Sequence, residues 1–190
     1  MKRAFLVHGW DGNPQNYWFP WLTKELETRG FAVVAPQLPD ALTPRIRPWV
    51  STLSEIVGAV DEETFFVGHS MGCQTILRFL QTLPPDQVAG GAILVAGFTG
   101  KLTGLTEEEK LVARPWEETP IDLNKVKGHV KHLAAVLSDN DPWVPLESNR
   151  KIFAENLGAE IVVEHTKDHF ETGSGVVELP IILNLLKKWA

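Results

Sequence analysis

A serine between two glycines is the most informative short motif of this chain. Residues 68–72 read Gly-His-Ser-Met-Gly; they follow the β-branched and aromatic run 64–67 and precede residues 73–80, whose apolar positions recur at helical spacing. A strand, a sharp turn and a helix would hold the Ser70 hydroxyl at the apex of a strained turn, clear of the sheet. We interpret Ser70 as a nucleophile. An ordinary turn is the alternative, because G-x-S-x-G also recurs by chance.

A serine hydroxyl is a weak nucleophile near neutral pH and needs a base, which a third group must orient. Two acids and two histidines fall after late predicted strands: Asp139 and Asp141, then His165 and His169. We favour Asp141, because two residues and then Val-Pro follow it, and His169, because it lies in a loop ahead of the last helix. Asp139 would then shape its turn, and His165 would have a structural role.

Attack on a carbonyl also requires donors for the negative oxygen that forms, and each backbone amide aimed there lowers the barrier by about 3 kcal/mol. The N–H of Met71, directly after the nucleophile, is one candidate. The N–H of Trp10 is the other, because Trp10 follows His8 and Gly9 at the end of the first predicted strand. We expect His8 and Gly9 to build that turn and to take no part in proton transfer.

Aromatic residues recur in the loops expected near the nucleophile. Phe98, Trp116, Trp143 and Phe170 are predicted to line an apolar acyl pocket there. The alternative for each of them is packing beneath a loop. The loop positions alone do not decide between these roles.

Short apolar runs alternate with longer helical patterns along the whole chain, which is typical of a parallel sheet with helices on both faces. We therefore predict an α/β fold: a three-layer α/β/α sandwich around a mostly parallel six-stranded sheet. Active groups of such sheets gather outside the carboxyl ends of the strands. The predicted strands are residues 4–7, 31–35, 64–67, 92–96, 133–137 and 161–163.

Besides the helix over residues 73–80, three more helices are predicted between and after these strands. The first has Pro20 in its first turn and Gly30 at its C-terminal cap, the second covers roughly residues 49–60, and the last begins near Pro180. Residues 98–128 interrupt the alternation, and we expect at most a short helix in them. They would form a small lid, a wall of the binding cleft, or only a long surface connection.

Length and composition fit a single domain over residues 1–190. Hydrophobic residues make up 44% of the chain, and the net charge of −6 comes without a basic cluster, so neither nucleic acid nor an anionic membrane is expected as a partner. The first apolar run is too short for a signal peptide. Cys73 is the one cysteine, which excludes an internal disulfide. A cytoplasmic location fits this.

Motifs of other chemistries are absent from the sequence. There is no cysteine pair or His-Glu-x-x-His for zinc, no G-x-x-x-x-G-K-[ST] phosphate loop and no G-x-G-x-x-G. We expect no metal and no cofactor.

With these motifs in place, the chain resembles the α/β-hydrolase superfamily, and within it the small serine hydrolases related to retinoblastoma-binding protein nine, bacterial members included. The motifs that carry the resemblance are His8-Gly9, Trp18 to Leu22, Gly68 to Cys73, Asp141 to Pro145, and His169-Phe170. The resemblance implies a compact domain that lacks the first two strands of larger hydrolases and has no separate cap domain. It also implies a triad of Ser70, Asp141 and His169.

One partner of that family is not expected here. The human member is named for binding the retinoblastoma protein through Leu-x-Cys-x-Glu, whereas Cys73 has Met71 two residues before it and Thr75 two residues after it. The leading hypothesis is a serine hydrolase that cleaves a small ester, thioester or amide through an acyl-enzyme on Ser70, with a small acyl compound as its partner. The alternatives are a protein-interaction module on a hydrolase scaffold and an acyltransferase that uses the same triad.

Overall fold

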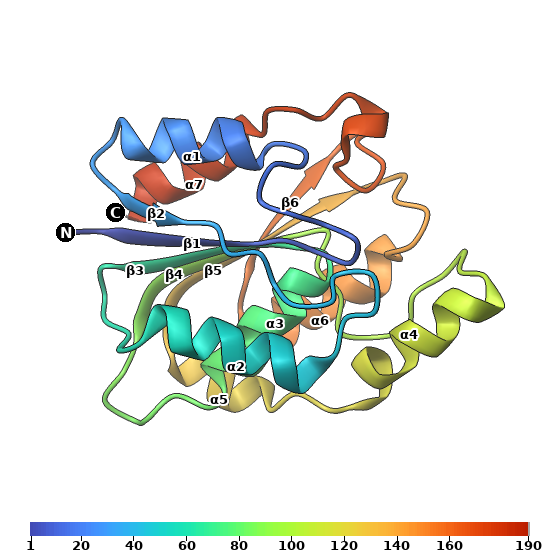
Figure 1. The fold of residues 1–190 in the computed structure, drawn as a ribbon, viewed down its shortest axis with the longest axis horizontal. Coiled ribbons are helices and arrows are strands. Elements are labelled where there is room, and N and C mark those ends of the chain that lie inside the picture. Colours follow the sequence, from blue (N-terminus) through green and yellow to red (C-terminus); the bar gives the residue numbers. More distant parts are fainter. Residues whose placement is uncertain (190) are drawn as a thin grey trace.

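The computed structural model describes residues 1–189 and contains one six-stranded sheet (Figure 1). All neighbouring strands are parallel, in the order β2-β1-β3-β4-β5-β6. The six predicted strands are confirmed, although β4 starts at Ala89 rather than Ala92 and β5 starts at Val130 rather than Leu133. The bounds are β1 (Arg3–Val7), β2 (Ala32–Val34), β3 (Thr64–His69), β4 (Ala89–Val95), β5 (Val130–Ser138) and β6 (Glu160–Glu164).

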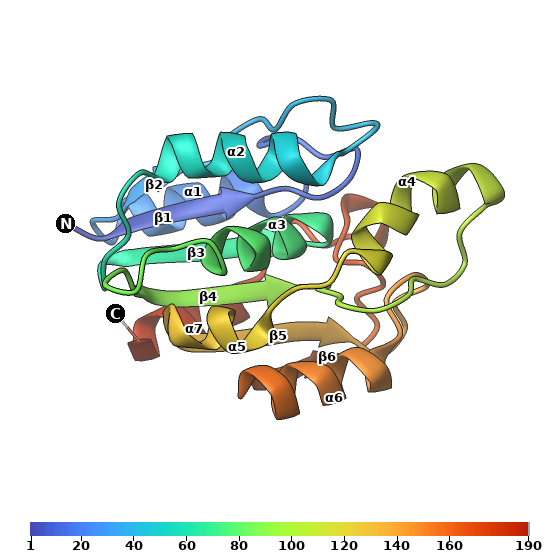
Figure 2. The same ribbon diagram turned by 90° about the horizontal axis from the view of Figure 1, so that it is seen from below.

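Helices cover both faces of the sheet, which confirms the three-layer architecture (Figures 1 and 2). Strands β3 and β4 are buried along their whole length, because they lie in the centre of the sheet with helices on both sides. One face carries α1 (Phe19–Glu27) and α7 (Pro180–Trp189), the latter preceded by the short 3₁₀ helix η1 (Thr172–Ser174). The other face carries α2 (Ile46–Val57), α3 (Met71–Leu80), α5 (Leu123–Gly128) and α6 (Leu146–Leu157).

The first helix ends as its sequence predicts. Pro20 lies in the first turn of α1, where its missing N–H costs no hydrogen bond. Gly30 has a φ of 80°, a left-handed conformation that favours glycine. The N–H of Gly30 donates to Glu27 O at 3.0 Å, and that of Phe31 donates to Leu26 O at 3.1 Å. These two bonds form a Schellman motif.

Residues 98–128 contain more helix than we expected. Helix α4 (Glu107–Glu118) runs for 12 residues and stands beyond the carboxyl ends of the strands (Figure 1). The expectation of at most a short helix was therefore wrong. Thr106 and Glu109 form a capping box that starts α4, and the buried Ala113 and Trp116 pack it against the core. Pro115 lies inside the helix but near its end.

A buried arginine connects α4 to α3, the helix that follows Ser70. Arg78 on α3 is 3% exposed, and its guanidinium donates to the backbone carbonyls of Trp116 at 3.1 Å and Thr119 at 2.7 Å. Burial lowers the pKa of Arg78 to about 10, so it remains charged at neutral pH. Carbonyls at a helix C-terminus carry partial negative charge, which suits this cation.

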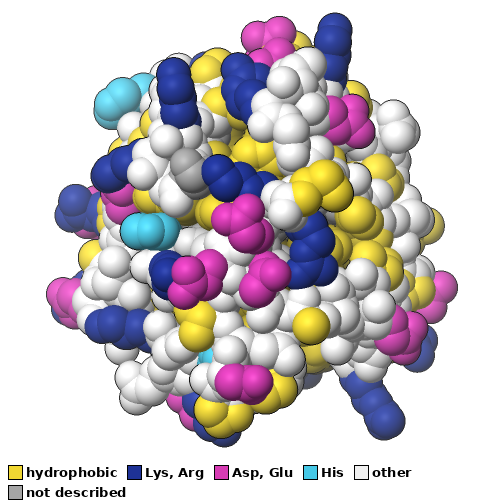
Figure 3. All heavy atoms as spheres, turned by 90° about the vertical axis from the view of Figure 1, so that its left-hand side faces the viewer, with side chains coloured by type: hydrophobic (Ala, Val, Ile, Leu, Met, Phe, Trp, Pro, Cys, Tyr) yellow, Lys and Arg dark blue, Asp and Glu magenta, His cyan; other side chains and the backbone are white. Residues whose placement is uncertain are grey.

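The face at the amino ends of the strands carries basic and acidic side chains interspersed with each other (Figure 3). Several are paired there: Lys131 Nζ lies 2.6 Å from Glu62 Oε1, and Lys188 Nζ lies 2.8 Å from Glu160 Oε2. Over residues 1–189, none of the helices combines the length and the apolar character needed to cross a bilayer.

Candidate active site

The predicted strand-turn-helix around Ser70 is present at the carboxyl end of the sheet, and its turn, residues 68–72, is called the elbow below. Ser70 lies between β3 and α3 with φ 52° and ψ −119°, a conformation that costs energy for a residue other than glycine. Its N–H donates to Val95 O at 2.9 Å. The residue is thus fixed in a strained turn between the ends of β3 and β4.

Glycines allow the elbow to approach the end of β1. A Cβ on Gly72 would lie 2.1 Å from Val7 O, so no side chain fits where α3 meets that strand. A Cβ on Gly9 would lie 2.9 Å from the Cβ of Ser70. The turn that contains Gly9 and Trp10 therefore lies directly beside the nucleophile candidate.

Two backbone amides next to Ser70 have no acceptor of their own. Within residues 1–189, neither the N–H of Trp10 nor that of Met71 donates to another group of the chain. Met71 is the first residue of α3, where the helix dipole adds partial positive charge. The Trp10 side chain donates to Leu42 O at 2.9 Å, which anchors its loop. Both amides remain candidates for an oxyanion hole.

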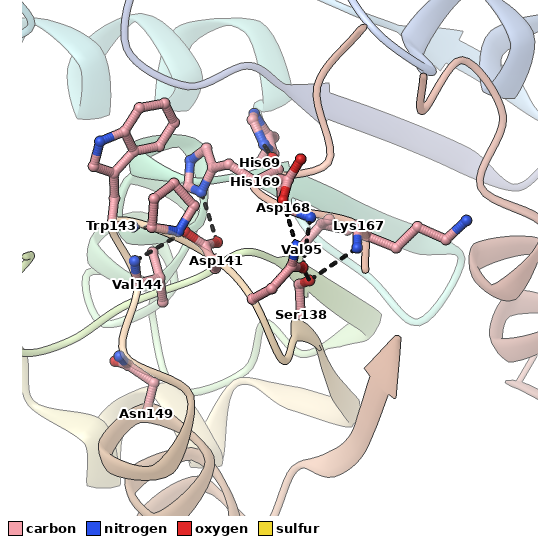
Figure 4. A network of polar contacts seen from close by, with 12 residues as sticks. His69, Val95, Ser138, Asp141, Trp143, Val144, Asn149, Lys167, Asp168 and His169 are labelled. Atoms are coloured by element: carbon pink, nitrogen blue, oxygen red, sulfur yellow. Dashed lines mark hydrogen bonds and ion pairs between the residues drawn. The ribbon is translucent and has the colours of Figure 1, made fainter. Parts of the chain in front are cut away.

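His169 and Asp141 form a buried pair (Figure 4). His169 Nδ1 lies 2.7 Å from Asp141 Oδ2, and the side chains are 7% and 2% exposed. The other carboxylate oxygen accepts the N–H groups of Trp143 and Val144 at 2.9 and 3.0 Å. Because a carboxylate only accepts, Nδ1 of His169 donates, and Nε2 is left as the basic nitrogen of the neutral ring.

His69, which the sequence analysis placed in the turn without a role of its own, supports this arrangement. His69 Nε2 donates to the backbone carbonyl of His169 at 2.8 Å, and the two rings lie side by side with centroids 4.9 Å apart. His69 is 2% exposed, and burial lowers its pKa to about 3. It is therefore neutral at physiological pH. Its position inside the elbow motif was the available signal.

Hydrogen bonds join the loops after β5 and β6 residue by residue, and Figure 4 shows those of Ser138 with Lys167 and of Asp141 with His169. Four consecutive residues after or at the end of β5 each contact the other loop, which sets the spacing of the acid and base candidates. The contacts are Ser138 Oγ with Lys167 N–H (3.2 Å), Asp139 Oδ1 with Thr166 N–H (2.9 Å), Asn140 Oδ1 with Asp168 N–H (2.9 Å) and Asp141 Oδ2 with His169 Nδ1 (2.7 Å).

The second acid and the second histidine also pair with each other. His165 Nδ1 lies 2.6 Å from Asp139 Oδ2, with side chains 79% and 37% exposed. We expected Asp139 to shape its own turn; instead it accepts hydrogen bonds from the neighbouring loop, at His165 and Thr166. These bonds hold the pKa of Asp139 below its ordinary value. The pair is a surface link between two loops.

A cavity of about 490 Å³ opens beside the elbow. Ser70 and His169 both line it, as do His69, Met71 and Trp10. The strained serine and the histidine held by Asp141 therefore face the same space.

Of the four aromatic residues predicted for the pocket, one lines the cavity and three do not. Trp143 lines the cavity, and its ring meets that of His169 edge-on with centroids 4.9 Å apart. Phe98, Trp116 and Phe170 do not belong to its lining and are at most 1% exposed. Phe98 and Trp116 pack in the core on the α3 side, and Phe170 packs in the core under α1 and α7. All three therefore have a packing role, and Trp116 lies on α4 rather than in a loop as expected.

Two further side chains near the elbow have structural roles. His8 Nε2 accepts the N–H of Leu38 at 2.9 Å and its Nδ1 donates to Gly9 O at 2.8 Å, and burial lowers its pKa. Cys73 is fully buried, which raises the pKa of its thiol and makes it a poor nucleophile. Across residues 1–189, no three side chains converge as metal ligands.

Backbone strain concentrates at this end of the molecule. Non-glycine residues with positive φ occur in the turn after β1, at the elbow and in the loop that carries His169, and strain of this kind gathers at functional sites. In these segments they are Asp11, Tyr17, Ser70, Thr166, Asp168 and Phe170.

Comparison with known proteins identifies the family. A sequence model described as Serine hydrolase matches residues 4–188. The chain belongs to the serine hydrolase family. It is 32% identical over 188 residues to the YdeN protein of Bacillus subtilis (strain 168), which covers 99% of this chain and 96% of YdeN. The crystal structure of YdeN superposes with a TM-score of 0.91 over 100% of this chain and 98% of YdeN.

Two other proteins extend the comparison. The serine hydrolase RBBP9 of Rattus norvegicus is 29% identical over 156 residues, which covers 81% of this chain and 78% of RBBP9. The resemblance inferred from the sequence motifs is thus confirmed. Est1E of Butyrivibrio proteoclasticus, solved with ferulic acid bound, shares the fold with a TM-score of 0.72 at 15% identity, over 98% of this chain and 90% of Est1E.

Proposed function

We propose that this serine hydrolase cleaves a small ester, thioester or amide through an acyl-enzyme on Ser70, with His169 as the base and Asp141 as its partner. One observation carries the proposal: Ser70 and His169 line the same cavity, and Nδ1 of His169 is hydrogen-bonded to the buried carboxylate of Asp141. Acyl transfer requires a base beside the nucleophile and an acid that orients the base, and this arrangement supports those roles for His169 and Asp141.

The mechanism follows from the orientation of each group. The Ser70 oxygen attacks the carbonyl carbon while His169 Nε2 takes its proton, and Asp141 stabilises the imidazolium that results. The N–H groups of Trp10 and Met71 stabilise the oxyanion. His169 then gives the proton to the leaving group, which departs and leaves the acyl group on Ser70. A water molecule that His169 deprotonates attacks this acyl group, and the carboxylic acid and free Ser70 are released.

The substrate class rests on the cavity and on a fold relative. A cavity of about 490 Å³ suits a small molecule. Est1E binds ferulic acid, a small carboxylic acid, and this supports a small carboxylic acyl group here. Trp10 and Trp143 supply apolar surface for such a group.

Replacement of the nucleophile tests the proposal. In Ser70→Ala, kcat for a p-nitrophenyl ester should fall by at least ~10⁴, because the acyl-enzyme cannot form. Ser51→Ala, which changes an exposed serine on α2, is the matched control and should keep the parental rate. A Ser70→Ala protein that hydrolyses its best ester at the parental rate would rule the mechanism out.

A further inference from the structure

The buried face of α6 begins with a polar residue. The buried residues of this helix are Asn149, Phe153 and Leu157, which are four residues apart and therefore form one stripe toward the core. Asn149 is 1% exposed. A carboxamide in such a stripe costs free energy unless it is hydrogen-bonded, whereas an apolar side chain would pack there without that cost. Packing alone therefore does not explain an asparagine at this position.

Both ends of the Asn149 carboxamide are bound to loop backbone. Its Oδ1 accepts the N–H of Thr99 at 3.1 Å, and its Nδ2 donates to Pro145 O at 2.8 Å. Thr99 follows β4, the strand whose end accepts the N–H of Ser70. Pro145 ends the segment of residues 141–145, called the acid loop below, and Asn149 lies on the helix directly after it (Figure 4). One buried side chain thus connects the chain beside the nucleophile to the acid loop.

The segment that leads from β4 to α4 also contacts the middle of the acid loop. The N–H of Thr103 donates to Trp143 O at 2.9 Å. The Thr103 hydroxyl donates to Pro142 O at 3.2 Å, with Trp143 O at 3.3 Å. Gly104 has a φ of 67°, and a Cβ there would lie 2.9 Å from Pro142 O. The two backbones are therefore in direct contact at this point.

These contacts act on the peptide groups that orient the acid. The N–H groups of Trp143 and Val144 donate to one oxygen of Asp141, and the other oxygen binds His169. A shift of the acid loop would move both N–H groups and would turn the carboxylate away from His169. Catalysis is sensitive to such shifts, since a misplacement of about 1 Å can cost about 10²-fold in rate.

We propose that Asn149 and Thr103 are positioning residues, which hold the acid loop so that the carboxylate of Asp141 faces His169. The inference rests on the proposed function and adds two residues outside the triad to it. Neither residue lines the cavity. Their replacement should therefore change kcat and leave KM nearly unchanged.

Asn149→Leu tests the first connection. Leucine continues the apolar stripe of α6, so the fold should be kept while both loops lose the carboxamide. We expect kcat for a p-nitrophenyl ester to fall by about tenfold and KM to change by less than about twofold. Asn156→Leu, at an exposed position of the same helix, is the matched control and should keep the parental kcat.

A double-mutant cycle distinguishes positioning from a merely structural role. In an Asp141→Asn background, Asn149→Leu should lower kcat by less than about twofold further, because the carboxylate that it positions is already gone. A structural role would give the same factor in both backgrounds. Urea unfolding of each variant verifies that the fold is kept under the assay conditions.

Gly104→Ala tests the second connection and keeps the inference testable if Asn149→Leu does not fold. The added methyl group would push against Pro142 O, so kcat should fall by about fivefold with KM nearly unchanged. Gly58→Ala is the matched control. Gly58 has a similar φ of 64°, but a Cβ there has no neighbour within 4 Å. It carries the same backbone strain without the contact and should keep the parental kcat.

The outcomes separate the two proposals. If esters are hydrolysed in a Ser70-dependent way but Asn149→Leu and Gly104→Ala keep the parental kcat, the inference is wrong and the proposed function stands. The same holds if Asn149→Leu loses an equal factor with and without the Asp141 carboxylate. If no ester is hydrolysed in a Ser70-dependent way, the proposed function fails, and the inference fails with it.

Discussion

Two Asp-His pairs connect the same two loops, and only one of them faces the cavity. Asp141-His169 and Asp139-His165 both join the loop after β5 to the loop after β6, with N···O distances of 2.7 and 2.6 Å. Their surroundings differ. The side chains of the first pair are 2% and 7% exposed, and those of the second are 37% and 79% exposed.

The comparison shows that an Asp-His hydrogen bond alone does not indicate catalysis. In the buried pair water is excluded, so the carboxylate stabilises a charged imidazole far more than it would in solvent. Two backbone N–H groups also fix Asp141. The exposed pair is screened by water and salt, and its histidine does not line the cavity.

Removal of each acid should give the largest difference between the pairs. Asp141→Asn should lower kcat/KM for an ester by about 10³ to 10⁴, because the amide favours the wrong tautomer of His169 and cannot stabilise its charged form. Asp139→Asn should change kcat/KM by less than about threefold. Steady-state kinetics with one p-nitrophenyl ester measures both. Equal losses in the two variants would show that the exposed pair also serves the reaction.

The histidine that holds the buried pair in place should have a smaller effect. His69→Phe removes the donor to His169 O and leaves that carbonyl without a partner, so we expect kcat to fall by about tenfold with little change in KM for a neutral ester. His69→Gln is the control, because its amide nitrogen can reach the same carbonyl. It should recover most of the lost rate. If Phe and Gln variants behave alike, the bond to His169 does not position the base.

Acid stability should distinguish the buried histidine from the exposed one. The pKa of His69 is about 3 in the folded state, against an ordinary value of 6.5. Below pH 6.5 the unfolded chain binds a proton that the folded protein does not, so His69 stabilises the fold fully above that pH and less as the pH falls. The free energy of unfolding should decrease by up to about 1.4 kcal/mol per pH unit from this group.

Urea unfolding between about pH 4.5 and 7.5 measures this slope. His69→Gln should make it shallower, whereas His165→Gln, at a side chain that is 79% exposed, should leave it unchanged. His8, whose pKa burial also lowers, accounts for part of the remaining slope. An unchanged slope in His69→Gln would mean that His69 is protonated in the folded protein.

The sequence predicted the elbow well, because its glycines meet strict spatial requirements. A Cβ on Gly72 would collide with Val7 O, so this turn requires glycine and leaves a recognisable local pattern in the sequence. The order of strands and helices could be predicted equally well from the alternation of short apolar runs with helical patterns. The capping box at Thr106 was a local signal for α4 that the prolines and glycines nearby obscured.

The directions of side chains in the loops could not be predicted from the sequence in the same way. Phe170 has a φ of 58°, which helps turn its ring into the core next to the catalytic candidate His169, and no sequence pattern indicates such a conformation. The groups that line the cavity, among them Tyr17 and Glu171, come from loops far apart in the chain. Their proximity is a tertiary property, and only the folded structure brings them together.

The proposed function depends on activation of Ser70 by His169 and Asp141. Labelling of the folded protein with a fluorophosphonate probe, followed by mass spectrometry, tests it most directly. We expect a single adduct on Ser70, formed at the parental rate in Asp139→Asn and at least about 100-fold more slowly in Asp141→Asn. Folded protein that remains unlabelled, or an adduct on any other residue, would contradict the account.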